Sequence, residues 1–147
     1  MKVIEGDLVE FARNGRFDVI VHGCNCFCTM GAGVAKAIAA AFPEALAVDR
    51  ATPKGDRAKL GTNSVAACDR VTIVNAYTQF DWRGRGRKVD YDAVRSCFAE
   101  VSRRFPDARI GYPKIGAGLA GGDWDVIAGI IDEELAGREH TLVVLPG

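Results

Sequence analysis

Hydrophobic positions along the chain follow two alternating patterns. Short apolar runs, typical of buried strands, cover residues 2–5, 17–21, 64–68, 71–77, 109–113 and 141–145. Apolar residues at helical spacing predict helices over 8–12, 32–42, 44–51, 89–105 and 124–135. Asp69 and Arg70 alone separate two of the runs, which predicts a hairpin. Strands that alternate with helices predict an α/β sandwich with a largely parallel sheet.

Length and composition predict a single domain over 1–147. The chain is 48% hydrophobic, and no repeat or linker interrupts it. It carries 19 basic and 19 acidic residues, so the zero net charge argues against a general nucleic-acid coat. No apolar run has transmembrane length and the first residues lack a signal-peptide profile. We therefore expect a cytoplasmic monomer that binds no membrane.

The C-x-C-x-C run of Cys24, Cys26 and Cys28 raises the question of a metal site. Neighbours in such a run would alternate sides if the chain were extended. Zinc sites usually combine C-x₂₋₄-C spacing with a second pair of ligands. The chain offers no second pair and, besides His22, only His140. We expect reduced, half-buried thiols, and neither a metal nor a cofactor.

The segment 19–38 combines a strand, a glycine loop and a helix start. The apolar run that ends at Val21 is followed by the polar residues His22 and Asn25, then by Gly31 and Gly33. Backbone N–H groups without partners converge at such a helix start, at the positive end of the helix dipole, and hold phosphate or diphosphate groups. The segment therefore predicts an anion site.

Residues 112–124 repeat this arrangement in the sequence YPKIGAGLAGGDW. A strand ends, glycines permit positive φ or close backbone approach, and a helix begins near Trp124. Open α/β sheets bind ligands outside the carboxyl ends of their strands, so two such loops predict a dinucleotide-like ligand. A Rossmann-type dehydrogenase fits less well, because its G-x-G-x-x-G fingerprint follows the strand directly.

In these pieces the chain resembles the macrodomains, a family that binds ADP-ribose. The matching pieces are Gly6-Asp7-Leu8, Val21 to Asn25 with Gly31-Ala32-Gly33-Val34, and Pro113 to Leu119. The resemblance implies a three-layer α/β/α macrodomain sandwich with a mixed, mostly parallel sheet of about six strands. It also implies adenine at Asp7, diphosphate and distal ribose on the first loop, and closure of the second loop over the diphosphate. The expected ligand-binding residues are Asp7, Leu8, Gly23, Asn25, Met30, Gly31, Ala32, Gly33, Val34, Tyr77, Lys114, Ile115, Gly116, Ala117, Gly118 and Leu119.

Within that family the chain is similar to two hydrolytic branches. Its His-Gly-Cys-Asn-Cys run at 22–26 resembles the ADP-ribose-1''-phosphate phosphatases, and its two glycine loops resemble the terminal ADP-ribose protein glycohydrolases. Ala35 stands where common hydrolases of the family have an aspartate. Tyr77-Thr78-Gln79 lacks the glycohydrolase lysine, and Ala120 replaces the glycohydrolase aspartate. Neither mechanism therefore transfers intact.

Our leading hypothesis is a hydrolase that acts at the distal ribose, with ADP-ribose-1''-phosphate as the best-matched substrate. His22 would handle the proton, Asn25 would fix the ribose, and Asp123 is a candidate water activator. Backbone N–H groups of the two loops would stabilise the developing charge. Each side chain also has a structural alternative: loop shaping for His22, a turn for Asn25, and helix capping for Asp7 and Asp123.

Two other functions stay open. One is removal of ADP-ribosyl groups from proteins, nucleic acid or acetate esters by a substrate-assisted route, and the other is non-catalytic reading of ADP-ribose. The expected partners are ADP-ribose, or a derivative substituted at the distal ribose, and ADP-ribosylated macromolecules. Tyr77, Phe80 and Trp82 would stack on the ligand or pack on the sheet. We expect the run from Arg83 to Arg87 to be a solvated loop rather than an RNA contact.

Overall fold

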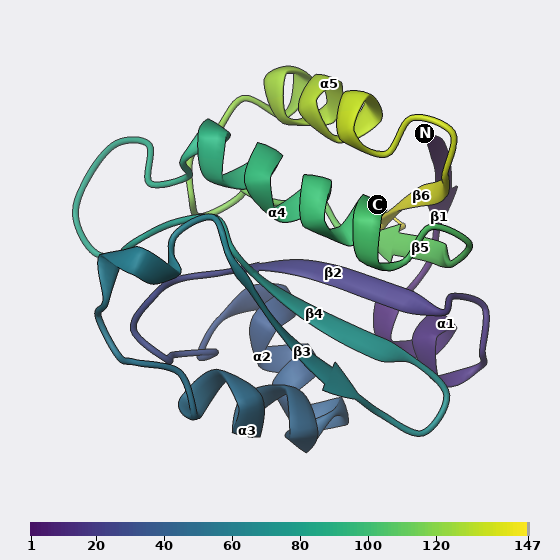
Figure 1. Ribbon diagram of the computed structural model, residues 1–147, viewed down its shortest axis with the longest axis horizontal. Coiled ribbons are helices and arrows are strands. Elements are labelled where there is room, and N and C mark those ends of the chain that lie inside the picture. Colours follow the sequence, from purple (N-terminus) through teal and green to yellow (C-terminus); the bar gives the residue numbers. More distant parts are fainter. Residues whose placement is uncertain (147) are drawn as a thin grey trace.

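A six-stranded mixed sheet lies between two layers of helices in the computed structural model, which describes residues 1–146 (Figure 1). The strands are β1 (Lys2–Glu5), β2 (Val19–Cys24), β3 (Asn63–Ala67), β4 (Thr72–Tyr77), β5 (Arg109–Tyr112) and β6 (Glu139–Val144). Their order is β1-β6-β5-β2-β4-β3, and every neighbouring pair is parallel except β3 with β4. The predicted sandwich and the predicted hairpin are confirmed.

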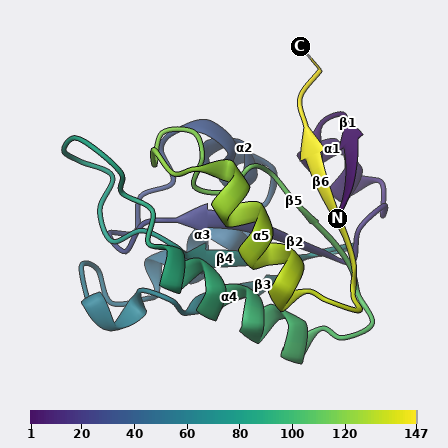
Figure 2. The same ribbon diagram turned by 90° about the horizontal axis from the view of Figure 1, so that it is seen from above.

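The helices divide between the two faces of the sheet (Figures 1 and 2). They are α1 (Leu8–Arg13), α2 (Gly33–Ala41), α3 (Pro43–Arg50), α4 (Tyr91–Arg104) and α5 (Trp124–Glu134), with a short 3₁₀ helix η1 (Arg57–Lys59). Helices α1, α2 and α3 cover one face, and α4 and α5 cover the other. Within residues 1–146, no helix is long and apolar enough to cross a membrane.

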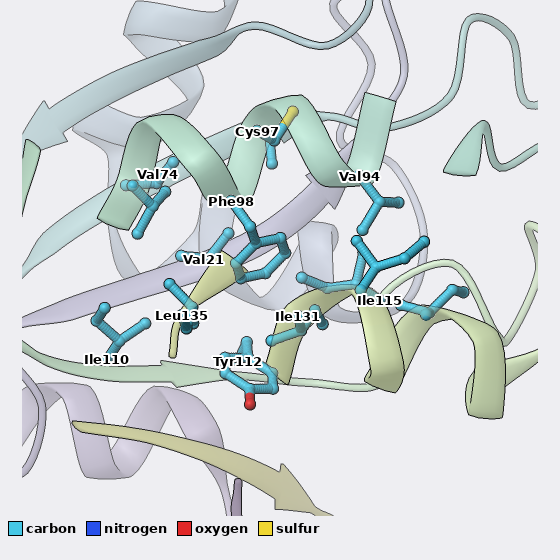
Figure 3. Close-up of a cluster of buried hydrophobic side chains, with 14 of the residues drawn as sticks. Val21, Val74, Val94, Cys97, Phe98, Ile110, Tyr112, Ile115, Ile131 and Leu135 are labelled. Atoms are coloured by element: carbon cyan, nitrogen blue, oxygen red, sulfur yellow. The ribbon is translucent and has the colours of Figure 1, made fainter. Parts of the chain in front are cut away.

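The larger hydrophobic core lies between the sheet and helices α4 and α5 (Figure 3). Phe98 of α4 and Tyr112 of β5 meet edge to face at 5.7 Å between ring centroids. Val94, Ile131 and Leu135 surround them with essentially no exposed surface. Close-packed side chains of this kind keep the strands rigid. The loops at the ends of the strands therefore start from fixed positions.

The predicted bounds of the second strand were wrong. The sequence pattern gives 17–21, whereas β2 runs from Val19 to Cys24. The strand continues through His22 because this polar side chain pairs with Asn75 on the neighbouring strand and is satisfied there. His22 is thus inside the strand and not at its end. The other predicted elements agree with the structure to within two residues.

Candidate functional site

Five parallel strands bring their carboxyl ends to one edge of the sheet. The connections that leave this edge are 6–7 after β1, 25–32 after β2, 78–90 after β4 and 113–123 after β5. Because β5 and β2 are neighbours, the two glycine loops of the sequence follow adjacent strands. In an open α/β sheet this edge is where ligands bind. We call it the carboxyl edge.

Helix α2 begins at the carboxyl edge without a side-chain cap. Ala32 is its N-cap residue, no side chain bonds to the first turn, and the first turn contains no acid. Among residues 1–146 no acceptor is recorded for the amides of Gly33, Val34 and Ala35. By contrast, Asp side chains cap α1, α4 and α5. Exposed amides at the positive end of a helix dipole attract an anion.

The glycines of the two loops fall into two groups. At Gly31, Gly33 and Gly118 an added Cβ would meet no atom within 4 Å, so these glycines border open space. At Gly116 an added Cβ would lie 2.6 Å from Val89 Cγ2, and Gly116 has φ +74°. Gly122 is equally crowded, at 2.5 Å from Val89 Cγ1. The first group leaves room for a ligand, and the second lets the loop pack on the core.

Asp7 caps α1 beside β1. Its Oδ1 accepts hydrogen bonds from Val9 N at 2.9 Å and Glu10 N at 3.2 Å. The side chain is exposed, and no bond to its Oδ2 is recorded within residues 1–146. One carboxylate oxygen therefore holds the helix while the other faces solvent. Leu8 beside it is buried in the core under α1.

His22 is enclosed within the sheet, with only 1% of its surface exposed. Its Nε2 lies 2.6 Å from Asn75 Oδ1, and Cys24 Sγ lies 3.6 Å from the same nitrogen. Burial lowers the pKa of His22 to about 4, although the hydrogen bond to Asn75 acts the other way. The imidazole is therefore neutral at pH 7. In this structure it has no exposed edge with which to touch a ligand.

Asn25 shapes the first loop with both ends of its amide. Its Nδ2 donates to Thr29 O and to Thr29 Oγ1 at 3.1 and 2.9 Å, and its Oδ1 accepts from Phe27 N at 2.8 Å. This arrangement is an asparagine turn. Contact of Asn25 with a distal ribose stays a prediction, and it would use these same atoms. Met30, at the end of the turn, is buried against the core that includes Leu8.

Tyr77 lies beneath α3 and is only 1% exposed. Its hydroxyl donates to Asp49 Oδ1 at 2.7 Å and lies 2.8 Å from Ser64 Oγ. The ammonium of Lys59 lies 4.7 Å from the ring centroid. The ring is thus enclosed by the protein, and it offers no free face for stacking on a ligand. Asp49 and Lys59 were not expected from the sequence, because nothing in their spacing signals burial.

Two polar residues flank the second loop. Lys114 is exposed before the glycines, and Asp123 is exposed after them as the N-cap of α5. Asp123 Oδ1 accepts from Asp125 N at 2.9 Å. Ile115 is buried against the larger core, while Ala117 is half-buried and Leu119 is 81% exposed. Asp123 is therefore a carboxylate that can reach solvent beside the glycine loop.

The three clustered cysteines do not alternate along an extended strand. The strand ends at Cys24, turns follow, and Cys28 has φ +58°. Burial raises the pKa of the Cys24 and Cys26 thiols, which keeps them protonated. The Cys28 thiol donates to Asp49 O at 3.3 Å. Residues 1–146 contain no group of three or more His, Cys, Asp or Glu side chains that could hold a metal ion.

Two open hollows lie away from the carboxyl edge. One, of about 200 Å³, is lined by Lys2, Arg16, Arg109 and Glu139 among others, where β5 and β6 begin. The second, of about 240 Å³, lies between α1, the end of α2 and the β3–β4 turn. Neither combines a glycine loop with free amides. The chemistry of the carboxyl edge makes it the better candidate for a ligand.

Comparison with known proteins agrees with this geometry. Residues 21–131 match the family described as Macro domain. A 17.5 kDa protein from the tk–vs intergenic region of Enterobacteria phage T4 is 39% identical over 152 residues, which cover 97% of this chain and 95% of the phage protein.

Solved structures share the fold. A Bacteroides thetaiotaomicron protein superposes with a TM-score of 0.83 at 26% identity, covering 98% of this chain and 99% of that one. Thermosipho africanus DarTG, solved in complex with ADP-ribose, gives a TM-score of 0.72 at 16% identity, over 99% of this chain and 42% of DarTG. The family match covers more than half of the sequence. The chain belongs to the macrodomain family.

Proposed function

We propose that this protein binds ADP-ribose, or a derivative substituted at the distal ribose, along the carboxyl edge. The observation that carries the proposal is the uncapped start of α2, where the amides of Gly33, Val34 and Ala35 have no recorded acceptor among residues 1–146 and Gly33 borders open space. A diphosphate would accept hydrogen bonds from these amides. The ADP-ribose bound to Thermosipho africanus DarTG, which shares the fold, supports the same ligand class.

The strand order suggests in which orientation the ligand would lie along the carboxyl edge, from adenine to distal ribose. Asp7 follows β1 at one side of the sheet, the second glycine loop follows β5, and the first follows β2. Adenine at the free oxygen of Asp7 would place the diphosphate between the two glycine loops. The distal ribose would then lie at the first loop, near Asn25, and its substituent would point toward the segment after β4.

Calorimetry with ADP-ribose tests the binding site by comparing Gly33→Ala with Gly15→Ala. Both glycines have positive φ, +58° and +73°, and at both an added Cβ meets no neighbour. Each substitution therefore costs roughly 1 kcal/mol of backbone strain, but only Gly33→Ala adds a methyl group at the start of α2. We expect at least a tenfold rise in Kd for Gly33→Ala alone. Equal affinities, or no binding by the wild type at millimolar ADP-ribose, would refute the proposal.

Hydrolysis at the distal ribose is a second candidate function, and the exposed carboxylate of Asp123 beside the second loop favours it. Asp123 would take a proton from the water that attacks the terminal phosphorus and return it to the ribose oxygen as the bond from phosphorus to that oxygen breaks, which gives ADP-ribose and inorganic phosphate. His22, enclosed within the sheet, would act only by holding β2 to β4, the strands from which the loops start.

Release of inorganic phosphate from ADP-ribose-1''-phosphate measures this reaction. Asp123→Asn keeps the helix cap but removes the base, because asparagine caps helices as well as aspartate does. Asp56→Asn, at the exposed cap of η1, is the matched control. We expect loss of turnover only in Asp123→Asn. Binding of ADP-ribose without phosphate release by the wild type would leave non-catalytic reading as the function.

A further inference from the structure

Three aromatic rings and two arginines form a cluster beside the first glycine loop. Phe27 meets Phe80 and Trp82 edge to face, at 5.0 and 6.0 Å between ring centroids. The guanidinium of Arg57 lies 4.0 Å from the centroid of Phe80, and that of Arg83 lies 4.8 Å from the centroid of Trp82. We call these five residues the aromatic–arginine cluster. Trp82 keeps 44% of its surface exposed.

The cluster continues into a strongly basic segment. Residues 83–88 read RGRGRK, with four basic residues and no acid, in a chain whose basic and acidic residues balance at 19 each. Among residues 1–146 the one acidic side chain that pairs with them is Asp81, whose carboxylate accepts three hydrogen bonds from the Arg83 guanidinium, at 2.9, 3.2 and 2.8 Å. Arg85 and Arg87 are exposed and have no recorded acidic partner within residues 1–146. The segment therefore carries a local positive charge.

The basic segment was expected to be a solvated loop, and its arginines are indeed exposed. Its ends, however, are fixed to both glycine loops. Phe80 O accepts from Cys26 N at 2.9 Å, and Ala120 O accepts from Lys88 N at 2.7 Å. Figures 1 and 2 show the β4–α4 connection projecting from the body of the molecule. The basic residues 83–88 and the exposed ring of Trp82 thus lie on one projecting segment whose two ends are held by hydrogen bonds.

We propose that the aromatic–arginine cluster and the segment 83–88 bind single-stranded nucleic acid. Exposed rings and guanidinium planes stack on bases, whatever the sequence, and nearby arginines pair with phosphates. A duplex keeps its bases stacked on one another and cannot offer them to Trp82. Charge complementarity alone would also admit an acidic protein segment, but such a segment makes no use of an exposed indole beside the guanidinium of Arg83.

The site is separate from the α2 amides, so the proposal does not depend on ADP-ribose binding. The two are adjacent, because the segment after β4 lies next to the first glycine loop. A nucleic acid bound there would pass the end of the carboxyl edge at which we place the distal ribose.

Fluorescence anisotropy with a labelled single strand of about twelve nucleotides tests the proposal. Trp82→Ala is expected to raise Kd by about 5- to 100-fold, as for loss of one stacked base. The double variant Arg85→Ala/Arg87→Ala should weaken binding and make log K less steep against log salt by roughly 1.4, since each phosphate contact on a single strand contributes about 0.7. Arg103→Ala/Arg104→Ala removes two exposed arginines at the end of α4 and is the matched control.

The expected result is loss of affinity in both cluster variants, little change in the control, and weaker binding of a duplex of the same sequence. Quenching of indole fluorescence in the wild type and its absence in Trp82→Ala would locate the bases. Three results would overturn the proposal: no binding of the single strand at low salt, equal loss in the control, or full displacement of the oligonucleotide by poly-glutamate at equal charge. Calorimetry with ADP-ribose on the same variants reports separately on the carboxyl edge.

Discussion

The imidazole of His22 and the carboxamide of Asn75 face each other across β2 and β4, with Nε2 2.6 Å from Oδ1. Asn75 Nδ2 donates to Ala45 O and to Ser64 Oγ, which fixes the orientation of the amide. Oδ1 must then accept, so His22 carries its proton on Nε2. The pair ties two central strands to α3, and it accounts for a histidine in the middle of a buried strand.

This pair predicts a pH dependence of stability. The folded protein holds the pKa of His22 at about 4, against 6.5 for a free imidazole. Between these values the unfolded chain binds a proton that the folded protein does not, so stability is full above pH 6.5 and falls as the pH drops toward 4. The loss is on the order of 3 kcal/mol. Urea unfolding at pH 7, 5.5 and 4.5 measures it.

His22→Gln removes this titration, so its unfolding free energy should change much less between pH 7 and pH 4.5. His140→Gln is the matched control. Burial also lowers the pKa of His140, but this side chain is only half-buried, so it should contribute less than His22 to the pH dependence of stability. The same pH slope in wild type and His22→Gln would show that His22 does not carry the effect. The Asp18 and Asp81 carboxylates titrate below this window, because Arg109 and Arg83 lower their pKa values.

A second prediction concerns the hydroxyl of Tyr77, which gives buried Asp49 its hydrogen bond at 2.7 Å. Asp49 Oδ2 has no partner among the described residues, so Tyr77→Phe would leave the whole carboxylate without a side-chain donor. We expect the unfolding free energy to fall by about 2–3 kcal/mol. Because the ring is enclosed, the Kd for ADP-ribose should stay unchanged. Chemical denaturation and calorimetry on the same sample separate the two effects.

The partner variant Asp49→Asn makes this prediction specific. With the charge removed, the further loss of the Tyr77 hydroxyl should cost less than it does in the wild type, and a double-mutant cycle gives the coupling. Additive losses in the cycle would mean that the 2.7 Å contact contributes nothing of its own. A raised Kd for ADP-ribose in Tyr77→Phe would instead show that the hydroxyl, through its contacts with Asp49 and Ser64, contributes to ligand binding.

A third prediction separates the two groups of glycines. Gly116→Ala would force a methyl group to within 2.6 Å of Val89 at positive φ, so we expect a loss of about 2 kcal/mol or more in stability. Gly118→Ala meets no neighbour and should leave stability within about 0.5 kcal/mol. Its added methyl group would nevertheless occupy part of the open space beside the second glycine loop, where we propose that the ligand binds. Thermal unfolding with and without ADP-ribose distinguishes the two variants, and equal stabilities would contradict this assignment.

The sequence predicted the sheet because its strands are short apolar runs with helices between them, and both glycine loops lie where such a pattern puts them. It could not place His22, because a polar residue after an apolar run usually marks a strand end. Only the partner Asn75, 53 residues away, shows that the strand continues. Pairings between distant residues are set by tertiary packing and leave no local pattern.

The candidate site divides in the same way. Asp7 and the amides of α2 belong to local motifs, so the sequence alone could propose them as candidates. Tyr77 has the local pattern of a residue at a strand end, yet it turns to buried Asp49 and away from solvent. The aromatic–arginine cluster joins residues 27, 57 and 80–83, which lie on three separate segments. The sequence contains each of these residues, but it does not show that they contact one another in the fold.

A fourth prediction is that Asp7→Asn changes the preference of the site from adenine to hypoxanthine. One oxygen of this carboxylate caps α1, and the other is free to accept a hydrogen bond from the adenine amino group. In Asp7→Asn the carboxamide oxygen keeps the cap. The Asn side-chain NH₂ would then face the adenine amino group, so two hydrogen-bond donors would meet. We expect the Kd for ADP-ribose to rise about 10- to 100-fold. A ligand with hypoxanthine in place of adenine presents a carbonyl at this position and should regain affinity in the variant, whereas it should bind the wild type poorly.

The unfolding free energy of Asp7→Asn should stay within about 0.5 kcal/mol of the wild-type value, since asparagine and aspartate cap helices equally well. Asp56→Asn controls for loss of an exposed carboxylate at a helix cap. Calorimetry with both ligands on all three proteins gives the specificity ratio, and a ratio that Asp7→Asn leaves unchanged would remove adenine from this end of the carboxyl edge.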